Sequence, residues 1–378
     1  MSYSTSLSTI CVIGSDGFIG KNLCHHLYIY EGLNIRLINK ETDPNEYEKL
    51  LYNCDVVFHF AGVNRTENIQ DFQNINVKLT KTVASIVSES KKPVKFIYTS
   101  SVQATLDNAY GKSKLESETE LKKIFANTLV DLKIYRLPGV FGKWSRPNYN
   151  TVVATFCFNI INDINIKMDD PNKLLSLVYI DDVVDEFVRH IHNSNERSNE
   201  DEYSVKPIHN ITMERLVDIL YTFKKSKLSL EVPSFKDPII KKLYSTYISF
   251  FAKDQFLYKL DLKKDDRGCL FEWIKSADFG QVFISRTLPG ITRGNHFHRT
   301  KSEKFLVIEG KAEICFRHIV SNDMMCYVVD GEKPEVVDIP TGYAHYIKNI
   351  GNSILITLFW ANEIFDSSNP DTFPKIVK

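Results

Sequence analysis

The sequence predicts a two-part protein, with an α/β doubly wound parallel sheet in its N-terminal part and an all-β barrel in its C-terminal part. An apolar, β-branched run at 9–13 leads into a glycine-spaced turn at 14–20 and then into a helical pattern. Strand-like and helix-like segments alternate from there to about residue 240. Beyond about residue 260 the pattern changes to short strands with turn signals roughly every ten residues, which is typical of a barrel or sandwich.

The first turn has the glycine spacing of a dinucleotide site. Gly14, Gly17 and Gly20 follow the strand at intervals of three residues. Such glycines permit a tight turn, the close approach of a pyrophosphate and the packing of helix against strand. The spacing alone is weak evidence, and its position between two strand-like runs strengthens it.

The end of the second strand, at 34–38, is where the two nicotinamide cofactors are distinguished. An acid there hydrogen-bonds the 2′-hydroxyl of NAD, and a cation favours the 2′-phosphate of NADP. Lys40 stands at this point with Glu41 after it, which favours NADP(H). The alternative is that Lys40 is only a solvated turn residue.

A tyrosine and a lysine four residues apart open the helical pattern after the next strands. Tyr110 and Lys114 share one face of this helix, within reach of a common ligand. Most pairs with this spacing are only helix surface. Here the pair follows a buried strand that ends in a Phe-Ala-Gly segment, 60–62, and another strand that ends at Ser101.

These elements, in this order, resemble the extended short-chain dehydrogenase/reductase family, which has a Rossmann-type fold. The resemblance implies that Tyr110 donates a proton to a carbonyl oxygen, that Ser101 bonds the same oxygen, and that Lys114 holds the nicotinamide ribose. Ser100 is the alternative to Ser101, because the loop to Tyr110 is short. The implied NADPH-binding residues are Gly14, Asp16, Gly17, Phe18, Ile19, Lys40, Phe60, Ala61, Gly62, Asn76, Tyr110 and Lys114.

Members of this family that modify sugar nucleotides place several loops around the substrate, and the matching segments here carry cations. The residues that we expect to bind substrate are Asn64, Arg65, Arg136, Lys143 and Arg146. The cations would face a diphosphate. Exposed loop cations are usually only solvated, which is the alternative explanation for each of them.

Two segments of the C-terminal part carry side chains of the kinds that bind metal ions. His296 and His298 alternate across one Phe, so on a strand they share a face, and Glu303 can return to that face from the next strand. His345 supplies a fourth donor from the second segment. Three imidazoles and one carboxylate suit a divalent transition metal, with zinc favoured. The alternative is a barrel strand with surface histidines and no metal.

The spacing of these donors resembles both signature motifs of the cupin superfamily, whose members are jelly-roll barrels. One departure is Pro334, which stands where a glycine is expected. The opening segment 266–272 also resembles dTDP-sugar 3,5-epimerases, in which an Arg-Gly-x-His segment supplies a catalytic base. His296 is therefore open to two roles, and the complete donor set favours the role of ligand.

We expect an NADP-binding reductase domain over 1–245 and a metal-binding cupin domain over 255–378. This combination resembles the bifunctional enzymes of capsular polysaccharide synthesis over essentially the whole chain. The resemblance implies C3 epimerisation of a UDP-4-keto-6-deoxy-hexosamine in the cupin, followed by C4 reduction with NADPH. The implied product is UDP-2-acetamido-2,6-dideoxy-L-talose, on the pathway to UDP-N-acetyl-L-fucosamine.

Two other functions remain open. One is a single-activity 4-ketosugar reductase whose cupin only binds sugar or drives dimerisation. The other is a non-enzymatic NADP-sensing protein, which the intact Ser101, Tyr110 and Lys114 set argues against. Because cupins commonly pair through barrel strands, we expect a homodimer.

The composition argues against several classes of protein. Lys and Arg total 47, and so do Asp and Glu, so no global charge attracts nucleic acid or an anionic membrane. The first nine residues lack the form of a signal peptide, and no apolar run reaches the ~20 residues that cross a bilayer. The seven cysteines are scattered without Cys-x2-Cys spacing, which favours reduced thiols in a cytoplasmic protein.

Overall fold

A computed structural model describes residues 8–149, 151–192 and 203–378 of the chain. Contacts within the chain divide it into two compact units. The first unit comprises Met1–Leu220 with Lys241–Phe250, and the second comprises Tyr221–Ile240 with Phe251–Lys378. The segment 221–240 thus belongs to the second unit, although it precedes the junction expected from the sequence.

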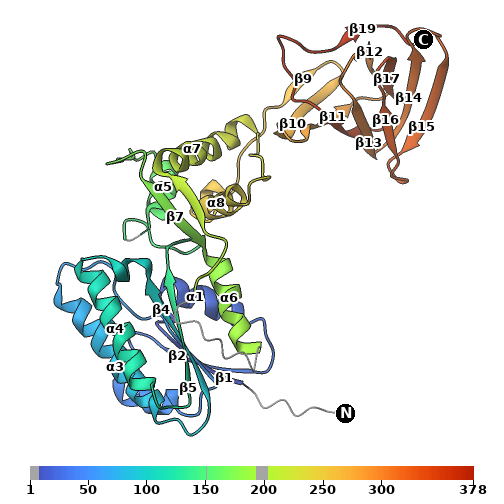
Figure 1. The fold of residues 1–378 in the computed structure, drawn as a ribbon. Helices are drawn as coiled ribbons and strands as arrows, with labels where there is room; N and C mark the ends of the chain where they lie inside the picture. The colour runs from blue at the N-terminus through green and yellow to red at the C-terminus, as the bar shows by residue number, and fades with distance from the viewer. Residues whose placement is uncertain (1–7, 150, 193–202) are drawn as a thin grey trace, which may run out of the picture. The chain divides into compact units, whose positions relative to one another are not determined.

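A five-stranded parallel sheet forms the centre of the first unit, in the order β2-β1-β3-β4-β5 (Figure 1). Its strands are β1 (Ser8–Ile13), β2 (Leu33–Ile38), β3 (Val56–His59), β4 (Val94–Ser101) and β5 (Val130–Leu137). The chain runs outward from β1 to β2 and then returns to the other side of β1. Such a reversal of strand order leaves a ligand crevice at the carboxyl ends of the strands.

Helices cover both faces of this sheet: α1 (Phe18–Leu27) and α6 (Ile180–His192) cover one face, α3 (Leu79–Ser88) and α4 (Ala109–Phe125) the other (Figure 1). Strand residues point alternately to the two faces. Val12 and Phe58 therefore pack under α1 and α6, whereas Ile13 and Phe96 pack under α3 and α4. This confirms the predicted doubly wound sheet.

A second, three-stranded sheet in the order β6-β7-β8 completes the first unit. Its strands are β6 (Gly139–Phe141), β7 (Leu174–Tyr179) and β8 (His209–Thr212). The other helices of the described chain, in either unit, are of three kinds. The α-helices are α2 (Tyr47–Leu51), α5 (Val152–Ile161), α7 (Met213–Ser229) and α8 (Pro238–Ile248). The 3-10 helices are η1 (Pro44–Glu46), η3 (Val102–Thr105) and η4 (Lys253–Gln255), and the π-helix is η2 (Phe72–Lys78). No helix in the described ranges is both long and apolar enough to cross a membrane.

The second unit contains two antiparallel sheets, in the orders β16-β13-β18-β11-β10-β9 and β15-β14-β17-β12-β19. The strands are β9 (Lys263–Asp265), β10 (Gly268–Ser276), β11 (Gly280–Thr287), β12 (Thr292–Phe297), β13 (Glu303–Glu309), β14 (Lys311–His318), β15 (Met324–Asp330), β16 (Val336–Ile339), β17 (Tyr343–Asn349), β18 (Leu355–Ala361) and β19 (Phe373–Pro374). Apolar side chains from both sheets, among them Phe305, Ile314 and Phe359, form one core. This confirms the predicted all-β barrel.

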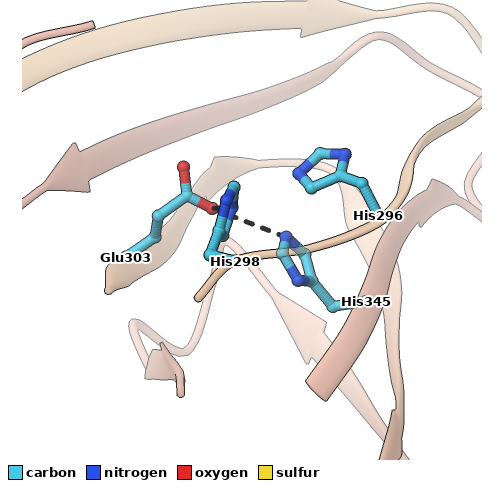
Figure 2. Close-up of side chains that lie close together, drawn as sticks. All are labelled: His296, His298, Glu303 and His345. Carbon is cyan, nitrogen blue, oxygen red and sulfur yellow. Dashed lines mark hydrogen bonds and ion pairs between the residues drawn. The ribbon is translucent and has the colours of Figure 1, made fainter. Parts of the chain in front are cut away.

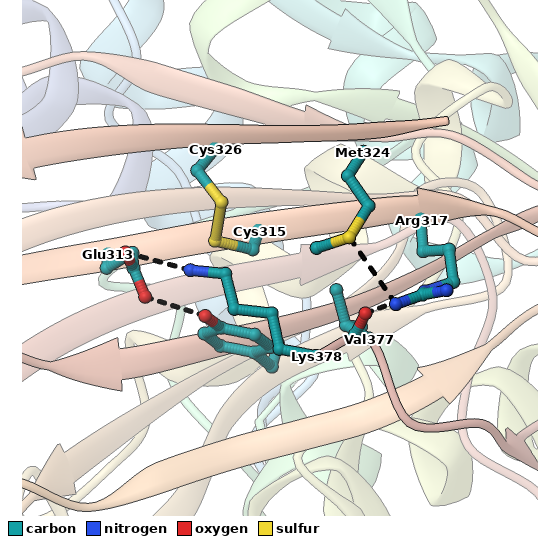
Figure 3. The surroundings of a disulfide bond; sticks show 8 residues. Glu313, Cys315, Arg317, Met324, Cys326, Val377 and Lys378 are labelled. Atoms are coloured by element: carbon teal, nitrogen blue, oxygen red, sulfur yellow. Dashed lines mark hydrogen bonds and ion pairs between the residues drawn. A yellow bond between two sulfur atoms is a disulfide. The ribbon is translucent and has the colours of Figure 1, made fainter. Parts of the chain in front are cut away.

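The expectation of seven reduced cysteines is wrong for two of them. Cys315 on β14 and Cys326 on β15 form a disulfide (Figure 3). The two residues are directly opposite in the antiparallel ladder, with their Cα atoms 4.1 Å apart, so neighbouring strands bring the sulfurs together. The other cysteines, Cys11, Cys24, Cys54, Cys157 and Cys269, are free.

Candidate functional site

The glycine turn lies at the carboxyl end of β1, at the point where the strand order reverses. Gly14 has φ +82°, and a Cβ added there would lie 2.7 Å from the backbone nitrogen of Ala61, so only glycine fits. Gly17 precedes α1, and no side chain in the described part of the chain caps this helix. The backbone N–H groups of the first turn, near Phe18 and Ile19, are therefore available to an anion such as a pyrophosphate. Asp16 is exposed beside them.

Asn76, which was expected to contact the cofactor, holds the loop after β3 in place through hydrogen bonds of its side-chain amide. The Asn76 amide accepts a hydrogen bond from Val63 N at 2.8 Å and donates to Val63 O and Ser113 Oγ, both at 2.9 Å. Asn76 is fully buried, so its side chain braces the 61–63 loop against α4. A Cβ added at Gly62 would lie 3.7 Å from Lys114 Nζ, which places this loop beside the expected catalytic lysine.

Lys114 and Tyr110 project from successive turns of α4. Lys114 is buried and donates hydrogen bonds to Tyr98 Oη at 3.1 Å and Thr99 O at 2.7 Å. Burial alone would lower the pKa of Lys114, but the neighbouring Tyr98 and Tyr110 outweigh it, and the pKa is raised. Lys114 therefore stays charged at neutral pH. Tyr110 is half-buried, and its ring centroid lies 6.0 Å from that of Phe72.

The two adjacent serines at the end of β4 differ in what they contact. The Ser100 hydroxyl donates to the buried Glu118 carboxylate, whereas Ser101 Oγ accepts one bond, from Gln103 N at 3.1 Å. The hydroxyl proton of Ser101 is not used in that contact. This difference supports Ser101 over Ser100 as the residue that would bond a substrate oxygen.

Arg136, expected to face a diphosphate, is engaged inside the protein. Its Nε and Nη2 atoms donate to the two carboxylate oxygens of Glu118, at 3.0 and 2.6 Å. Glu118 lies one turn after Lys114 on α4 and was not singled out from the sequence. The spacing of four that links Tyr110, Lys114 and Glu118 is the signal that points to it.

The other expected substrate and cofactor cations lie at separate places. Lys40 is exposed after β2 with Glu41 3.6 Å away, Lys143 pairs with Asp181, and the Arg146 guanidinium lies 5.4 Å from the centre of the Tyr149 ring. Arg65 borders a cleft of about 530 Å³ in the first unit. The remaining residues lining this cleft are Asn148, Tyr149, Thr151, Val152, Thr155 and Phe156. Asn64, next to Arg65, has a buried Oδ1 with no hydrogen bond to the described residues.

The four expected metal donors converge in the second unit (Figure 2). They come from β12, β13, β17 and the residue after β12, and one ligand atom from each lies within 4.8 Å of all the others. Glu303 Oε2 is 3.2 Å from His298 Nε2 and 3.5 Å from His345 Nε2. The His296 ring centroid lies 4.7 Å from that of His345, its partner in the β12–β17 ladder.

The protonation of this cluster fits a divalent metal. Burial, followed by the nearby His345 and His298, lowers the pKa of His296 to about 4. Burial alone would raise the pKa of Glu303, but the adjacent His298 and His345 outweigh it and lower the pKa to about 2. His345 Nε2 is buried, lies 3.5 Å from Glu303 Oε2 and has no hydrogen-bond partner among the described residues. Neutral imidazoles with an ionised carboxylate are the donors that zinc-type ions take.

Comparisons with known proteins bear on both units. The model of the NAD dependent epimerase/dehydratase family matches residues 10–205, and that of the polysaccharide biosynthesis C-terminal domain matches residues 263–373. The chain belongs to the NAD dependent epimerase/dehydratase family. A nicotinamide cofactor is therefore expected at the glycine turn, and the absence of capping at α1 fits it.

Two known proteins resemble the chain over nearly its whole length. One is the UDP-2-acetamido-2,6-beta-L-arabino-hexul-4-ose reductase of Pseudomonas aeruginosa, 40% identical over 96% of this chain and 97% of the relative. The other is the crystal structure of CapF, a capsular polysaccharide assembling protein of Staphylococcus aureus, with TM-score 0.90 and 41% identity over 97% of this chain and 99% of that one. A UDP-glucuronic acid 4-epimerase of Bacillus cereus in complex with NAD shares only the fold, at 18% identity and TM-score 0.55 over 66% of this chain and all of that one.

Asp371, which lies beside the donor cluster, was not among the residues predicted from the sequence. Asp371 contacts both His298 and the turn that precedes Glu303. It lies 73 residues from His298, in a segment without a motif, so no local pattern points to it. Only the three-dimensional structure brings it to the cluster.

Proposed function

We propose that this member of the epimerase/dehydratase family is a bifunctional nucleotide-sugar enzyme of surface polysaccharide synthesis. The second unit would epimerise C3 of a UDP-4-keto-6-deoxy-hexosamine, and the first unit would reduce the C4 ketone. The observation that carries the proposal is the donor cluster of His296, His298, Glu303 and His345, in a chain that resembles a named ketosugar reductase over 96% of its length. A divalent metal in this cluster would supply Lewis-acid stabilisation of negative charge on the C4 oxygen.

The chemistry of the substrate fixes the order of the two steps. The hydrogen on C3 is acidic only while C4 is a ketone, because the carbanion left by its removal delocalises into the carbonyl. Reduction of C4 to an alcohol removes that acidity. Epimerisation therefore comes first, and reduction makes the new configuration permanent. The product would be UDP-2-acetamido-2,6-dideoxy-L-talose.

Three residues of the first unit would act in the reduction, for which NADPH supplies the hydride. Tyr110 would donate the proton to the C4 oxygen, and Ser101 would hold that oxygen by a hydrogen bond. The charged Lys114, fixed by Tyr98 and Thr99, would hold the nicotinamide ribose and keep positive charge beside the phenol. The exposed Lys40 after β2 supports NADPH over NADH.

Recognition of the UDP-sugar is assigned to the cleft that Arg65 borders. Arg65 lines it from the loop after β3, with Asn64 next to it in sequence, and the guanidinium of Arg146 lies 5.4 Å from the centre of the Tyr149 ring in its lining. Lys143 would add positive charge. Arg136 is left out, because its Nε and Nη2 atoms already donate to Glu118.

A second candidate is a reductase with one activity, whose β-barrel unit binds sugar or mediates homodimer formation without catalysis. The name of the Pseudomonas aeruginosa relative, which specifies a reductase alone, favours this candidate. The two candidates differ in whether C3 exchanges its hydrogen with solvent.

The test is NADPH oxidation with a UDP-4-keto-6-deoxy-hexosamine in D2O, with the product analysed by NMR. From the wild type we expect a product with deuterium at C3 and inverted C3 configuration. From H296A/H298A, or from wild type treated with a chelator, we expect no deuterium at C3 and no inversion. H318A is the matched control, since His318 lies in the same unit outside the donor cluster. Reduction without C3 exchange in the wild type would establish the single-activity reductase instead. If the wild type oxidised no NADPH, the non-enzymatic NADP-sensing protein would be the better hypothesis.

A further inference from the structure

We propose that Asp371 is a positioning residue of the metal centre, which fixes two of its ligands, His298 and Glu303, at once. The inference rests on the proposed metal site of the second unit and adds a residue to it. Asp371 lies outside the donor cluster, and neither motif contains it. Its backbone and its side chain contact different parts of the ligand-bearing segment.

The backbone carbonyl of Asp371 orients His298. Nδ1 of His298 lies 2.6 Å from Asp371 O, and a carbonyl can only accept, so Nδ1 carries the proton. The lone pair of the ring is thereby placed on Nε2, the nitrogen that faces Glu303. A hydrogen bond of this kind to a ligating histidine fixes both the tautomer and the ring plane.

The carboxylate of Asp371 closes the turn that joins the two ligands. It accepts hydrogen bonds from the backbone nitrogens of Arg299, Thr300 and Lys301 at 3.0, 2.8 and 2.8 Å, and from Thr300 Oγ1 at 3.0 Å. This turn begins directly after His298 and ends two residues before Glu303. One side chain therefore sets the path of the chain from one ligand to the other.

The backbone at Asp371 is held in a conformation that non-glycine residues seldom adopt. Its φ is +41°, in the left-handed region, which aspartate tolerates better than most residues. Lys301 Nζ donates to Pro370 O at 2.7 Å and lies 3.4 Å from Thr372 Oγ1, so the segment is anchored on both sides of Asp371. The same residue can thus present its carbonyl to His298 and its carboxylate to the turn.

The experiment measures metal affinity in the full-length protein, freed of metal and titrated with Zn²⁺ against a chromogenic chelator. Co²⁺ absorption reports the coordination geometry in parallel. D371A keeps the backbone carbonyl that contacts His298 but removes the carboxylate that closes the turn from 299 to 301. Because that turn sets the positions of His298 and Glu303, we expect D371A to bind Zn²⁺ at least ~10-fold more weakly than wild type and to change the Co²⁺ spectrum, as loss of the groups that support metal ligands does elsewhere. D366A is the matched control, because Asp366 caps a turn at Ser368 in the same segment and contacts no ligand.

Two milder variants keep the test decisive if D371A does not fold. D371N retains one acceptor oxygen, that of the amide carbonyl. T300V removes one of the four hydrogen bonds to the Asp371 carboxylate. We expect intermediate losses of affinity from both, with unfolding midpoints of the metal-free proteins close to that of D366A. Affinities of D371N and T300V within twofold of wild type, or a loss from D366A as large as that from D371N, would overturn the inference. A wild type that binds no Zn²⁺ would overturn the proposed metal site as well.

Discussion

Glu118 and Arg136 form a two-point ion pair in the first unit, with Nε to Oε1 at 3.0 Å and Nη2 to Oε2 at 2.6 Å. The carboxylate is nearly fully buried, and it also accepts the Ser100 hydroxyl. Three elements meet in this contact: α4, which carries Tyr110 and Lys114, β5, and the end of β4. The pair therefore holds the helix with the proposed proton donor against β5, and the Ser100 hydroxyl joins the same carboxylate to the strand that ends at Ser101.

Removal of the Glu118 charge should destabilise the protein strongly. E118Q leaves the partly buried Arg136 guanidinium without its counter-charge. Breaking a fully buried pair costs about 3–5 kcal/mol, which is the upper limit for this pair. The measurement is urea unfolding. E116Q is the control, since Glu116 lies on the same helix but is exposed and only accepts from Gln73. Equal stability of E118Q and E116Q would show that the pair contributes little.

Tyr110 should be needed for reduction and dispensable for cofactor binding. Y110F removes the hydroxyl that would protonate the C4 oxygen, and loss of such an acid lowers the rate by about 10²–10⁴-fold. NADPH fluorescence titration should give an affinity close to that of wild type, because the phenyl ring and Lys114 remain. An unchanged reduction rate in Y110F would remove Tyr110 from the proton-donor role.

His59 should make stability depend on pH in the acid range. It is fully buried, and burial, with a smaller contribution from the charge of Lys114, lowers its pKa from 6.5 to about 3. Between these values the unfolded chain binds a proton that the folded chain does not, so stability falls as pH drops from 6.5 towards 3. The slope is at most about 1.4 kcal/mol per pH unit.

Unfolding free energies of H59Q and wild type, measured from pH 7 to pH 4, test this sign. Wild type should lose stability relative to its value at pH 7 more steeply than H59Q does. H25Q is the control, because His25 is an exposed histidine on α1. Parallel profiles for wild type and H59Q would contradict the prediction.

The disulfide between β14 and β15 should stabilise the second unit. A cross-link that closes a loop of this size contributes about 2–4 kcal/mol by restricting the unfolded chain. C326S should therefore lower the thermal midpoint of the second unit, and a reducing agent should lower that of wild type equally. C269S, which removes a free cysteine of the same unit, is the control. If reducing agent left the thermal midpoint of wild type unchanged, the disulfide would add no stability.

Much of the fold was predictable because its signals are local. The glycine turn, the alternation of strands and helices and the later change to short strands each occupy a continuous stretch of sequence. Three members of the donor cluster were predictable for a related reason: His296, His298 and Glu303 share one short segment, in which the two histidines alternate across one residue and a short turn leads to Glu303.

What escaped prediction depends on contacts between distant segments. The contact between Arg136 and Glu118 was not predicted, because Glu118 lies on a helix whose position relative to β5 the sequence does not reveal. The Cys315–Cys326 disulfide depends on the register of two antiparallel strands. Asp371 reaches His298 only because β19 and the segment before it run beside β12.

The π-helix η2 has a consequence for insertions and deletions in this part of the chain. Seven residues, Phe72–Lys78, follow the wider turn of a π-helix, and Asn76 lies within them. Such a turn holds one residue more than an α-helical turn. Deleting one residue before Asn76 would therefore restore α-helical pairing but rotate the Asn76 side chain by about 100° around the helix axis. The amide would then lose Val63 and Ser113 together, so the length of this segment is constrained even where its individual side chains are free to vary.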